Sequence, residues 1–228
     1  MAGKLYGTGV GPGDPKLLTL KALEIIKECA AIAFPGKSPE SSTAFNIALK
    51  AYPKIKDKEL LGIYMPMTKD EEILLKSHED AAKKICRVLD EGKDIAFLTL
   101  GDPALYSTYI YIHERVVQKG YEAVIINGVP SFCAAAAALG ISLGQKDEQI
   151  HIIPASYEEG DALSLSGTKV FMKAGRSMGD LKKLLIERGA QAVMAENCTM
   201  EGERLYIGAE NFPEDAGYYS LIIVKDKA

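Results

Sequence analysis

The sequence predicts an α/β protein of two α/β domains, the first built around a mostly parallel sheet and the second around a mixed sheet. The chain has 228 residues, of which 47% are hydrophobic and 25% charged, enough for one large core or two small ones. Short apolar runs alternate with helical segments in the first half, and strand candidates become denser in the second half. We place the domain boundary near residue 128, which gives domains 1–128 and 129–228 with an active-site cleft between them.

The first half alternates strands with helices, which is typical of a parallel sheet. Predicted strands cover residues 4–10, 30–36, 60–66, 94–102 and 121–130. Predicted helices cover residues 19–30, 42–52 and 70–92. Thr19 is the expected N-cap of the first helix. The residues expected on the buried faces are Leu20, Leu23, Ile26 and Ala30 in the first helix, and Leu74, His78, Ala81, Ile85 and Leu89 in the long one.

The second half is richer in strands. Five candidates cover residues 149–155, 168–175, 190–198, 203–210 and 217–226. An alanine run at 134–138 and the segment 178–189 are the helical candidates. Strands this close together along the chain favour a mixed sheet with antiparallel members.

Charge and composition disfavour several classes of protein. The net charge is −4 and the isoelectric point is about 5.5, so no overall basic field attracts nucleic acid. The N-terminal residues lack the apolar core of a signal peptide, and no apolar run approaches the ~18 residues of a membrane span. We therefore expect a cytoplasmic protein. The four cysteines form no C-x-x-C pair and the three histidines lie singly, so we expect no bound metal.

Two glycine-containing segments follow predicted strands. In "GTGVGPGDP" (7–15), Pro12 stands where glycine would close a G-x-G-x-x-G motif, so phosphate binding is disfavoured. Pro12 and Pro15 instead predict a stiff loop at the carboxyl end of a strand, which is either a ligand-binding loop or only a rigid turn.

The second segment, "LTLGDPALYSTY" (98–109), has the same placement after a strand. Gly101 allows a ligand to approach the backbone, and Asp102 offers a carboxylate to a donor such as a ribose or an ammonium group. The alternative is that Asp102 caps a helix that begins near Tyr106.

Several segments together resemble the tetrapyrrole methylases, which use S-adenosylmethionine. They are "GVGPGDPKLLTLKA" (9–22), "LGDPALYSTY" (100–109) and "GVPSF" (128–132), although Pro130 stands where serine or threonine is common. "AFPG" (33–36), "MPMT" (65–68) and "FMKAG" (171–175) are most similar to the branch that methylates C20 of precorrin-2 or cobalt-factor II in cobalamin biosynthesis. The alternatives are a methylase of this fold with another substrate, including another tetrapyrrole position, and a tetrapyrrole-binding module without catalysis.

The resemblance implies that S-adenosylmethionine is the cofactor. The residues it places at the cofactor are Pro12, Gly101, Asp102, Leu105, Ser131, Phe132, Met172 and Cys198. Leu105, Phe132 and Met172 would form an apolar wall. Taken without the resemblance, Met172 and Cys198 are equally well explained as core residues.

The substrate would be a small-molecule tetrapyrrole with many carboxylates. The candidate contacts are Tyr106, Lys69, Lys173 and Arg176, although exposed basic residues are often only solvated. We expect positioning to dominate catalysis, and we leave the proton acceptor open between Tyr106, Glu196 and water. Family members are commonly homodimers, and Tyr218 and Tyr219 near an edge strand favour a dimer here.

Overall fold

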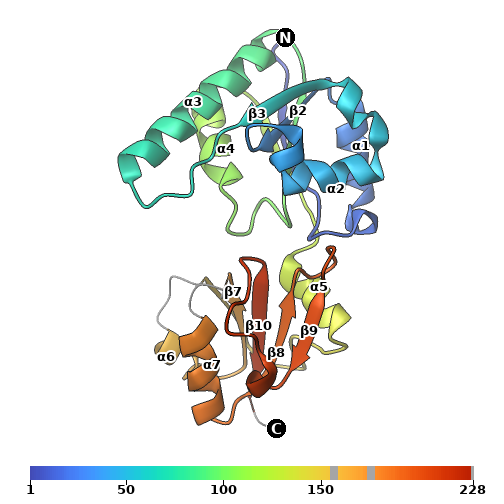
Figure 1. Cartoon of the computed structure of the whole chain (residues 1–228). Coiled ribbons are helices and arrows are strands. Elements are labelled where there is room, and N and C mark those ends of the chain that lie inside the picture. Colours follow the sequence, from blue (N-terminus) through green and yellow to red (C-terminus); the bar gives the residue numbers. More distant parts are fainter. Residues whose placement is uncertain (155–158, 174–177, 227–228) are drawn as a thin grey trace. The chain divides into compact units, whose positions relative to one another are not determined.

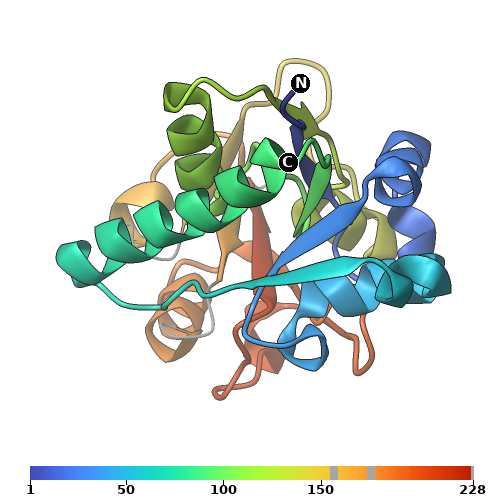
Figure 2. The ribbon, with the colours of Figure 1, turned by 90° about the horizontal axis from the view of Figure 1, so that it is seen from above.

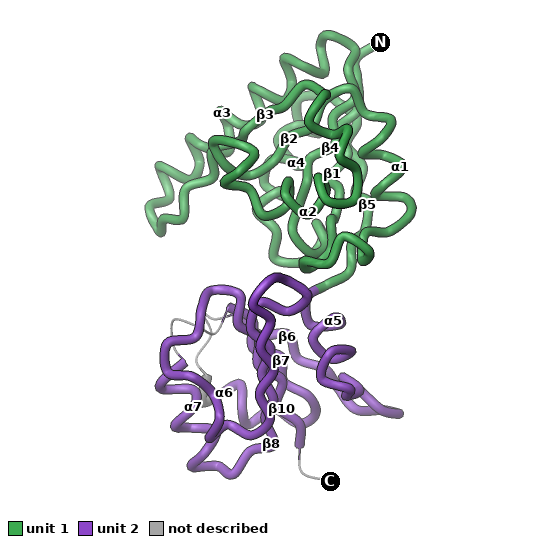
Figure 3. The backbone as a smooth tube through the Cα atoms, turned by 45° about the vertical axis from the view of Figure 1, so that its right-hand side comes forward, with its two compact units in different colours: residues 1–130 green, residues 131–228 purple. Residues whose placement is uncertain are grey.

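The computed structural model describes residues 1–154, 159–173 and 178–226. The chain divides into two compact units, Met1–Pro130 and Ser131–Ala228 (Figures 1 and 3). Each unit has its own sheet, so each is described separately. The α/β class, with one parallel and one mixed sheet, is confirmed.

The first unit contains a five-stranded sheet in the order β3-β2-β4-β1-β5, and all of its pairings are parallel. Its strands are β1 (Leu5–Gly9), β2 (Ala31–Pro35), β3 (Glu59–Ile63), β4 (Ile95–Thr99) and β5 (Ala123–Ile126). Its α-helices are α1 (Leu20–Glu28), α2 (Thr43–Ala51), α3 (Glu71–Asp90) and α4 (Tyr109–Gln118). Short 3₁₀ turns occur at Pro15–Leu17, Pro39–Ser41 and Pro53–Asp57. Since the strands are parallel, their carboxyl ends lie along one edge of the sheet.

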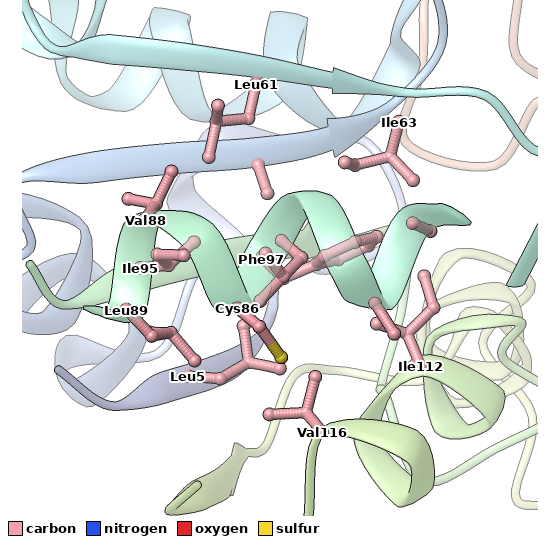
Figure 4. Close-up of a cluster of buried hydrophobic side chains, with 14 of the residues drawn as sticks. Leu5, Leu61, Ile63, Cys86, Val88, Leu89, Ile95, Phe97, Ile112 and Val116 are labelled. Carbon is pink, nitrogen blue, oxygen red and sulfur yellow. The ribbon is translucent and has the colours of Figure 1, made fainter. Parts of the chain in front are cut away.

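Helices cover both faces of this sheet because neighbouring residues of a strand point to opposite faces. Ala31 and Ala33 of β2 pack with α3 and α4, whereas Ile32 and Phe34 pack with α1 and α2. The cluster under α3 and α4 includes Phe97 of the fully buried strand β4 (Figure 4). Helices α3 and α4 lie side by side over this face (Figures 1 and 2).

The long helix follows the predicted pattern, but the first helix does not. Asp70 caps α3 by accepting from the backbone N–H groups of Glu72 and Ile73. Four residues of its predicted stripe are buried, namely His78, Ala81, Ile85 and Leu89.

In α1 the predicted N-cap is confirmed, because Thr19 accepts from the N–H of Ala22. The predicted buried face is confirmed at Ile26 and wrong at its two ends: Leu20 is 88% exposed and Ala30 lies beyond the end of the helix. The buried residues are Ala22, Ile25 and Ile26. The buried face therefore includes Ala22 and Ile25 in place of Leu20 and Ala30.

The second unit contains a mixed sheet in the order β6-β7-β10-β8-β9. Its strands are β6 (Ile150–Pro154), β7 (Thr168–Met172), β8 (Gln191–Glu196), β9 (Arg204–Ile207) and β10 (Ser220–Lys225). Only β6 and β7 pair in parallel, and the other pairings are antiparallel.

The helices of the second unit are α5 (Ser131–Ala138), α6 (Glu159–Ala162) and α7 (Met178–Glu187), with a 3₁₀ turn at Ala209–Asn211. Figure 3 shows α5 on one side of the sheet and α6 and α7 on the other. Leu181 and Leu185 of α7 pack on Phe171, Met194 and Ile222 of the sheet.

Two histidines lie partly or fully buried on α3 and α4. His78 is 6% exposed and stacks on Tyr111, with ring centroids 5.0 Å apart. The Nδ1 atom of His113 lies 3.0 Å from the hydroxyl of Tyr109. Burial lowers the pKa of both imidazoles, since a charged ring is poorly solvated there; nearby Arg115 further lowers the pKa of His78.

These pKa shifts predict how stability depends on pH. A folded-state pKa below the unfolded value of about 6.5 means that the unfolded chain binds more protons under acidic conditions. The free energy of unfolding should therefore be constant above pH 6.5 and fall as the pH drops through the folded-state values, by at most about 1.4 kcal/mol per pH unit and histidine. Urea unfolding between pH 7.5 and 5 measures this slope. The double variant His78→Gln/His113→Gln should show a weaker dependence of the free energy of unfolding on pH. An equal slope in that double variant would contradict the prediction.

Candidate active site

Three loops meet at the carboxyl ends of β1, β4 and β5 in the first unit. The N–H of Val10 donates to the carbonyl of Thr99 at 2.9 Å. Gly11 and Gly101 then exchange backbone hydrogen bonds of 3.3 and 2.8 Å, so the loops after β1 and β4 are joined. This is the sheet edge where open α/β proteins bind ligands.

Glycines allow these loops to approach so closely. A Cβ on Gly128 would lie 2.1 Å from the carbonyl oxygen of Gly101, and a Cβ on Gly9 would lie 2.6 Å from the nitrogen of Gly128. Gly101 differs from both, because it has a positive φ of +72° and nothing within 4 Å of the position its Cβ would take. Its backbone therefore borders open space, as a ligand-binding position requires.

Asp102 connects the loop after β4 to the loop after β5. Its Oδ2 atom accepts from the N–H of Gly128 at 2.9 Å and from the side-chain amide of Asn127 at 3.2 Å. Its Oδ1 atom accepts from the N–H of Ala104 at 2.7 Å, and the residue is 9% exposed. The alternative of a helix cap near Tyr106 is wrong, because α4 begins at Tyr109 and Asp102 bonds within its own turn and to the neighbouring loop.

The other predicted residues of this unit border the same loops. Pro12 is buried directly after the Gly11–Gly101 pair. Leu105 is half-buried and its N–H donates to the carbonyl of Asp102. Tyr106 is 52% exposed. Lys69 is exposed in the segment before α3.

Thr99, the last residue of β4, was not among the predicted site residues. It is 7% exposed, and its hydroxyl has no hydrogen-bond partner among the described residues. Gly9 of β1 is in register with Thr99 and has no side chain to cover the hydroxyl. A buried hydroxyl without a partner costs stability, so such groups in a native fold usually bond to an ordered water or a ligand. A polar residue at the end of an otherwise apolar central strand was the available signal in the sequence.

In the second unit, Ser131 and Phe132 form the first turn of α5, where Ser131 is half-buried and Phe132 is buried. Met172 ends β7 and is also half-buried. The exposed Lys173 follows it, with its ammonium 5.7 Å from the ring centre of Tyr218. Arg176 lies outside the described residues.

The loop after β8 holds the remaining candidates. Cys198 is 8% exposed, and burial together with nearby Glu203 raises the pKa of its thiol to about 12. It is therefore a neutral, apolar contact rather than a nucleophile. The carboxylate of Glu196 accepts from the N–H of Gly217 at 2.7 Å, which supports the loop before β10.

Backbone strain occurs at two predicted site residues, Tyr106 and Lys173, and at the two neighbours of Cys198. Five non-glycine residues of the described ranges have positive φ, and four of them are Tyr106, Lys173, Asn197 and Thr199, with φ between 47° and 63°. Left-handed conformations of such residues cost energy and cluster at functional sites. The strain thus marks the loops after β4, β7 and β8 as candidate ligand-binding segments.

These residues can bind and position a ligand, but they form no nucleophile activated by a base. Among the described residues, no group of three or more histidine, cysteine or acidic side chains is arranged to hold a metal ion. Nor does any helix in the described ranges combine the length and apolar content needed to cross a bilayer.

Comparison with known proteins identifies the family. Residues 4–211 match the family model described as Tetrapyrrole (Corrin/Porphyrin) Methylases. A protein of Methanocaldococcus jannaschii, named "Probable cobalt-precorrin-2 C(20)-methyltransferase", is 37% identical over 97% of this chain and 96% of its own length. The precorrin-2 C(20)-methyltransferase of a Sinorhizobium species is 29% identical over 97% and 95% of the two chains.

The fold of a solved relative is similar over the whole chain. The uroporphyrin-III C-methyltransferase of Thermus thermophilus, solved with S-adenosylhomocysteine, has a TM-score of 0.69. It is 20% identical, and the similarity covers 98% of each chain. The chain therefore belongs to the tetrapyrrole (corrin/porphyrin) methylase family.

Proposed function

We propose that this protein transfers one methyl group from S-adenosylmethionine to C20 of precorrin-2 or its cobalt-containing counterpart in cobalamin biosynthesis. The observation that carries the proposal is the 37% identity to the C20-methyltransferase of M. jannaschii over nearly the full length of both chains. The predicted segments Phe34–Gly36 and Met65–Thr68 lie at or just after the carboxyl ends of β2 and β3, where they are placed to orient the macrocycle.

The residues of the first unit fit the cofactor. The backbone of Gly101 borders open space, and Leu105 offers an apolar contact. Asp102 holds the loops after β4 and β5 together, and the hydroxyl of Thr99 is available for a hydrogen bond. S-adenosylmethionine supplies a methyl group that its sulfonium already activates. The task of the protein is then to align two bound molecules and exclude water, which can supply roughly 7–11 kcal/mol. We keep Pro12, Ser131, Phe132, Met172 and Cys198 as proposed cofactor contacts.

The proton that C20 loses needs an acceptor. The candidates are the exposed phenol of Tyr106, the carboxylate of Glu196, whose Oε1 atom accepts from the N–H of Gly217, and water. Tyr106→Phe and Glu196→Gln distinguish them: a fall in kcat at constant KM in one variant assigns the proton to that side chain, and an unchanged kcat in both assigns it to water.

The function is tested by incubating the protein with S-adenosylmethionine carrying a ¹³C methyl group. Precorrin-2, cobalt-factor II and uroporphyrinogen III are offered separately. We expect carbon NMR to place the label at C20 of one or both of the first two substrates, which also decides whether cobalt must be present. Label at C2, C7, C11 or C17, or binding of S-adenosylhomocysteine without any transfer, would refute the proposed activity.

Thr99→Val tests the proposed cofactor hydroxyl, because valine keeps the shape and removes the oxygen. We expect the free energy of unfolding to stay constant or rise by about 1 kcal/mol, while the Kd for S-adenosylhomocysteine rises about three- to tenfold. Thr8→Val is the control on neighbouring β1, since the hydroxyl of Thr8 already donates to the carbonyl of Tyr6. It should lower stability and leave the affinity unchanged. If calorimetry gives the same Kd for Thr99→Val and wild type, Thr99 does not contact the cofactor.

We also propose that the protein acts as a cytoplasmic homodimer. Apolar side chains lie exposed on the second unit, at Leu205 and Ile207 of edge strand β9 and at Tyr218 and Tyr219 before β10. A row of exposed apolar residues on a sheet edge favours association. Light scattering should give twice 24.7 kDa at micromolar concentration, and Ile207→Lys should shift the mass toward the monomer. A monomeric mass for the wild type would exclude the dimer.

A further inference from the structure

A cavity of about 480 Å³ lies between β3 and α3 in the first unit. Its strand side consists of Gly62, Ile63 and Tyr64, at the carboxyl end of β3, and its helix side is one face of α3. β3 is an edge strand, so the cavity is at the border of the sheet. Figure 4 shows Ile63 beside α3. None of the residues assigned above to the cofactor lines this cavity.

The face of α3 that lines the cavity repeats at helical spacing, through Ile73, Ser77, Asp80 and Lys84. The hydroxyl of Ser77 is buried and has no hydrogen-bond partner among the described residues. A serine inside a helix usually bonds to the carbonyl four residues earlier. Because this hydroxyl is covered by protein atoms, it can reach a ligand in the cavity once the side chain rotates about its Cα–Cβ bond.

Basic residues predominate around this cavity. Lys76 and Lys84 line it, and the ammonium of Lys37 lies 5.4 Å from the ring centre of Tyr64. The ammonium of Lys84 is held 2.9 Å from the carbonyl oxygen of Gly62. Asp80 is the acidic residue of the lining. Since the whole chain has a net charge of −4, this local excess of cations favours an anionic ligand.

The wall of the cavity is apolar. Ile63 and Ala81 are buried in it, whereas Tyr64 and Ile73 are 58% and 48% exposed. The ligand that fits combines an apolar body with a carboxylate, because ammonium and hydroxyl groups are donors to carboxylates.

We propose that this cavity binds one carboxylate side arm of the tetrapyrrole substrate, with Lys76 and Lys84 pairing with the carboxylate and Ser77 donating a hydrogen bond. This inference rests on the proposed function, and it adds a substrate contact to that function. β3 is separated from β4 by one strand, so the carboxyl ends of these two strands are about 10 Å apart along the same sheet edge. A macrocycle presented at the loop after β4 carries acetate and propionate arms on its rim that extend toward β3.

The test compares wild type, the double variant Lys76→Met/Lys84→Met, and Ser77→Ala. Lys83→Met is the control, because Lys83 lies on α3 outside the cavity lining and pairs with Glu79 at 3.8 Å. Binding of cobalt-factor II is followed by its absorption spectrum, binding of S-adenosylhomocysteine by calorimetry, and methyl transfer by KM and kcat.

We expect the double variant to raise the Kd for cobalt-factor II about tenfold and Ser77→Ala to raise it about threefold. The Kd for S-adenosylhomocysteine and kcat should stay close to wild type in both, and the melting temperature of the double variant should fall only slightly, because the bond from Lys84 to the carbonyl of Gly62 is lost. Lys83→Met should behave as wild type in every measurement. A Kd for cobalt-factor II within twofold of wild type in the double variant would overturn the inference.

The same measurements separate this inference from the proposed function. If wild type methylates C20 and the double variant does so with unchanged KM, only the cavity assignment fails. If wild type binds cobalt-factor II, loses affinity in the double variant and yet methylates another carbon, the cavity assignment stands and the C20 proposal fails. A wild type that binds no tetrapyrrole overturns both.

Discussion

Gly128→Ala is expected to destabilise the first unit by about 3 kcal/mol or more and to abolish measurable binding of S-adenosylhomocysteine. The added Cβ would lie 2.1 Å from the carbonyl oxygen of Gly101 and 2.9 Å from the Cα of Gly9, and both of these are backbone atoms. The loop after β4 cannot move away without losing its two backbone hydrogen bonds to Gly11. A substitution that forces a new atom against backbone atoms that cannot move is among the more destabilising kinds. Urea unfolding and calorimetry measure the two effects.

Substitutions of two other glycines serve as controls for this result. Gly101→Ala introduces a side chain at positive φ but meets nothing within 4 Å, so it should cost only the left-handed strain of about 1–2 kcal/mol. Gly179→Ala in α7 meets nothing and is not at positive φ, so it should be neutral or slightly stabilising. If Gly128→Ala unfolds at the same urea concentration as Gly179→Ala, the backbones of the three loops do not pack as closely as described.

The strands and the long helix could be predicted because their patterns depend on neighbouring residues. β4 is apolar at every position since both faces of the sheet are covered, and α3 carries its buried stripe at helical spacing. The buried face of the first helix was predicted only in part, because Leu20 is apolar and yet 88% exposed. A single apolar residue at the start of a helix does not determine which side faces the sheet.

The candidate site could be predicted only in part. The sequence places Gly101 and Gly128 after strands, but their contact depends on the order β4-β1-β5, which brings together loops far apart in the chain. The same holds for Asp102, whose partners Asn127 and Gly128 are 25 and 26 residues away. Its carboxylate was expected to meet a ligand, and the structure shows that donors of the protein already engage both oxygens.

Most of the backbone strain could not be predicted from the sequence. Lys173, Asn197 and Thr199 adopt positive φ, a conformation that the sequence usually signals with glycine. Asparagine adopts this conformation more readily than most other residues, so Asn197 was a weak signal in the sequence, whereas Lys173 and Thr199 gave none. Together with the closely packed glycines of the first unit, they favour a protein that acts by holding ligands in fixed positions rather than by supplying reactive side chains.

Asp102→Ala is expected to lower the free energy of unfolding by about 2–4 kcal/mol, because it removes the acceptor of three hydrogen bonds, two of which come from the loop after β5. The N–H of Gly128 would lose its partner. Loosening of the loop at Gly101 should then also weaken binding of S-adenosylhomocysteine by at least tenfold, whether or not Asp102 touches the cofactor.

Asp102→Asn separates a structural role from direct contact with the cofactor. Asparagine keeps one acceptor oxygen, but its amide is itself a donor and must face either the N–H of Ala104 or the donors of Asn127 and Gly128. It should therefore lose about half as much stability as Asp102→Ala. Asn127→Ala is the control, since it removes only the 3.2 Å bond and should cost less than about 1 kcal/mol.

If affinity for S-adenosylhomocysteine falls in proportion to stability across the three variants, Asp102 acts by positioning the loops. A loss of affinity in Asp102→Asn out of proportion to its loss of stability would indicate that the carboxylate contacts the cofactor, and unchanged affinity in all three would remove Asp102 from the site.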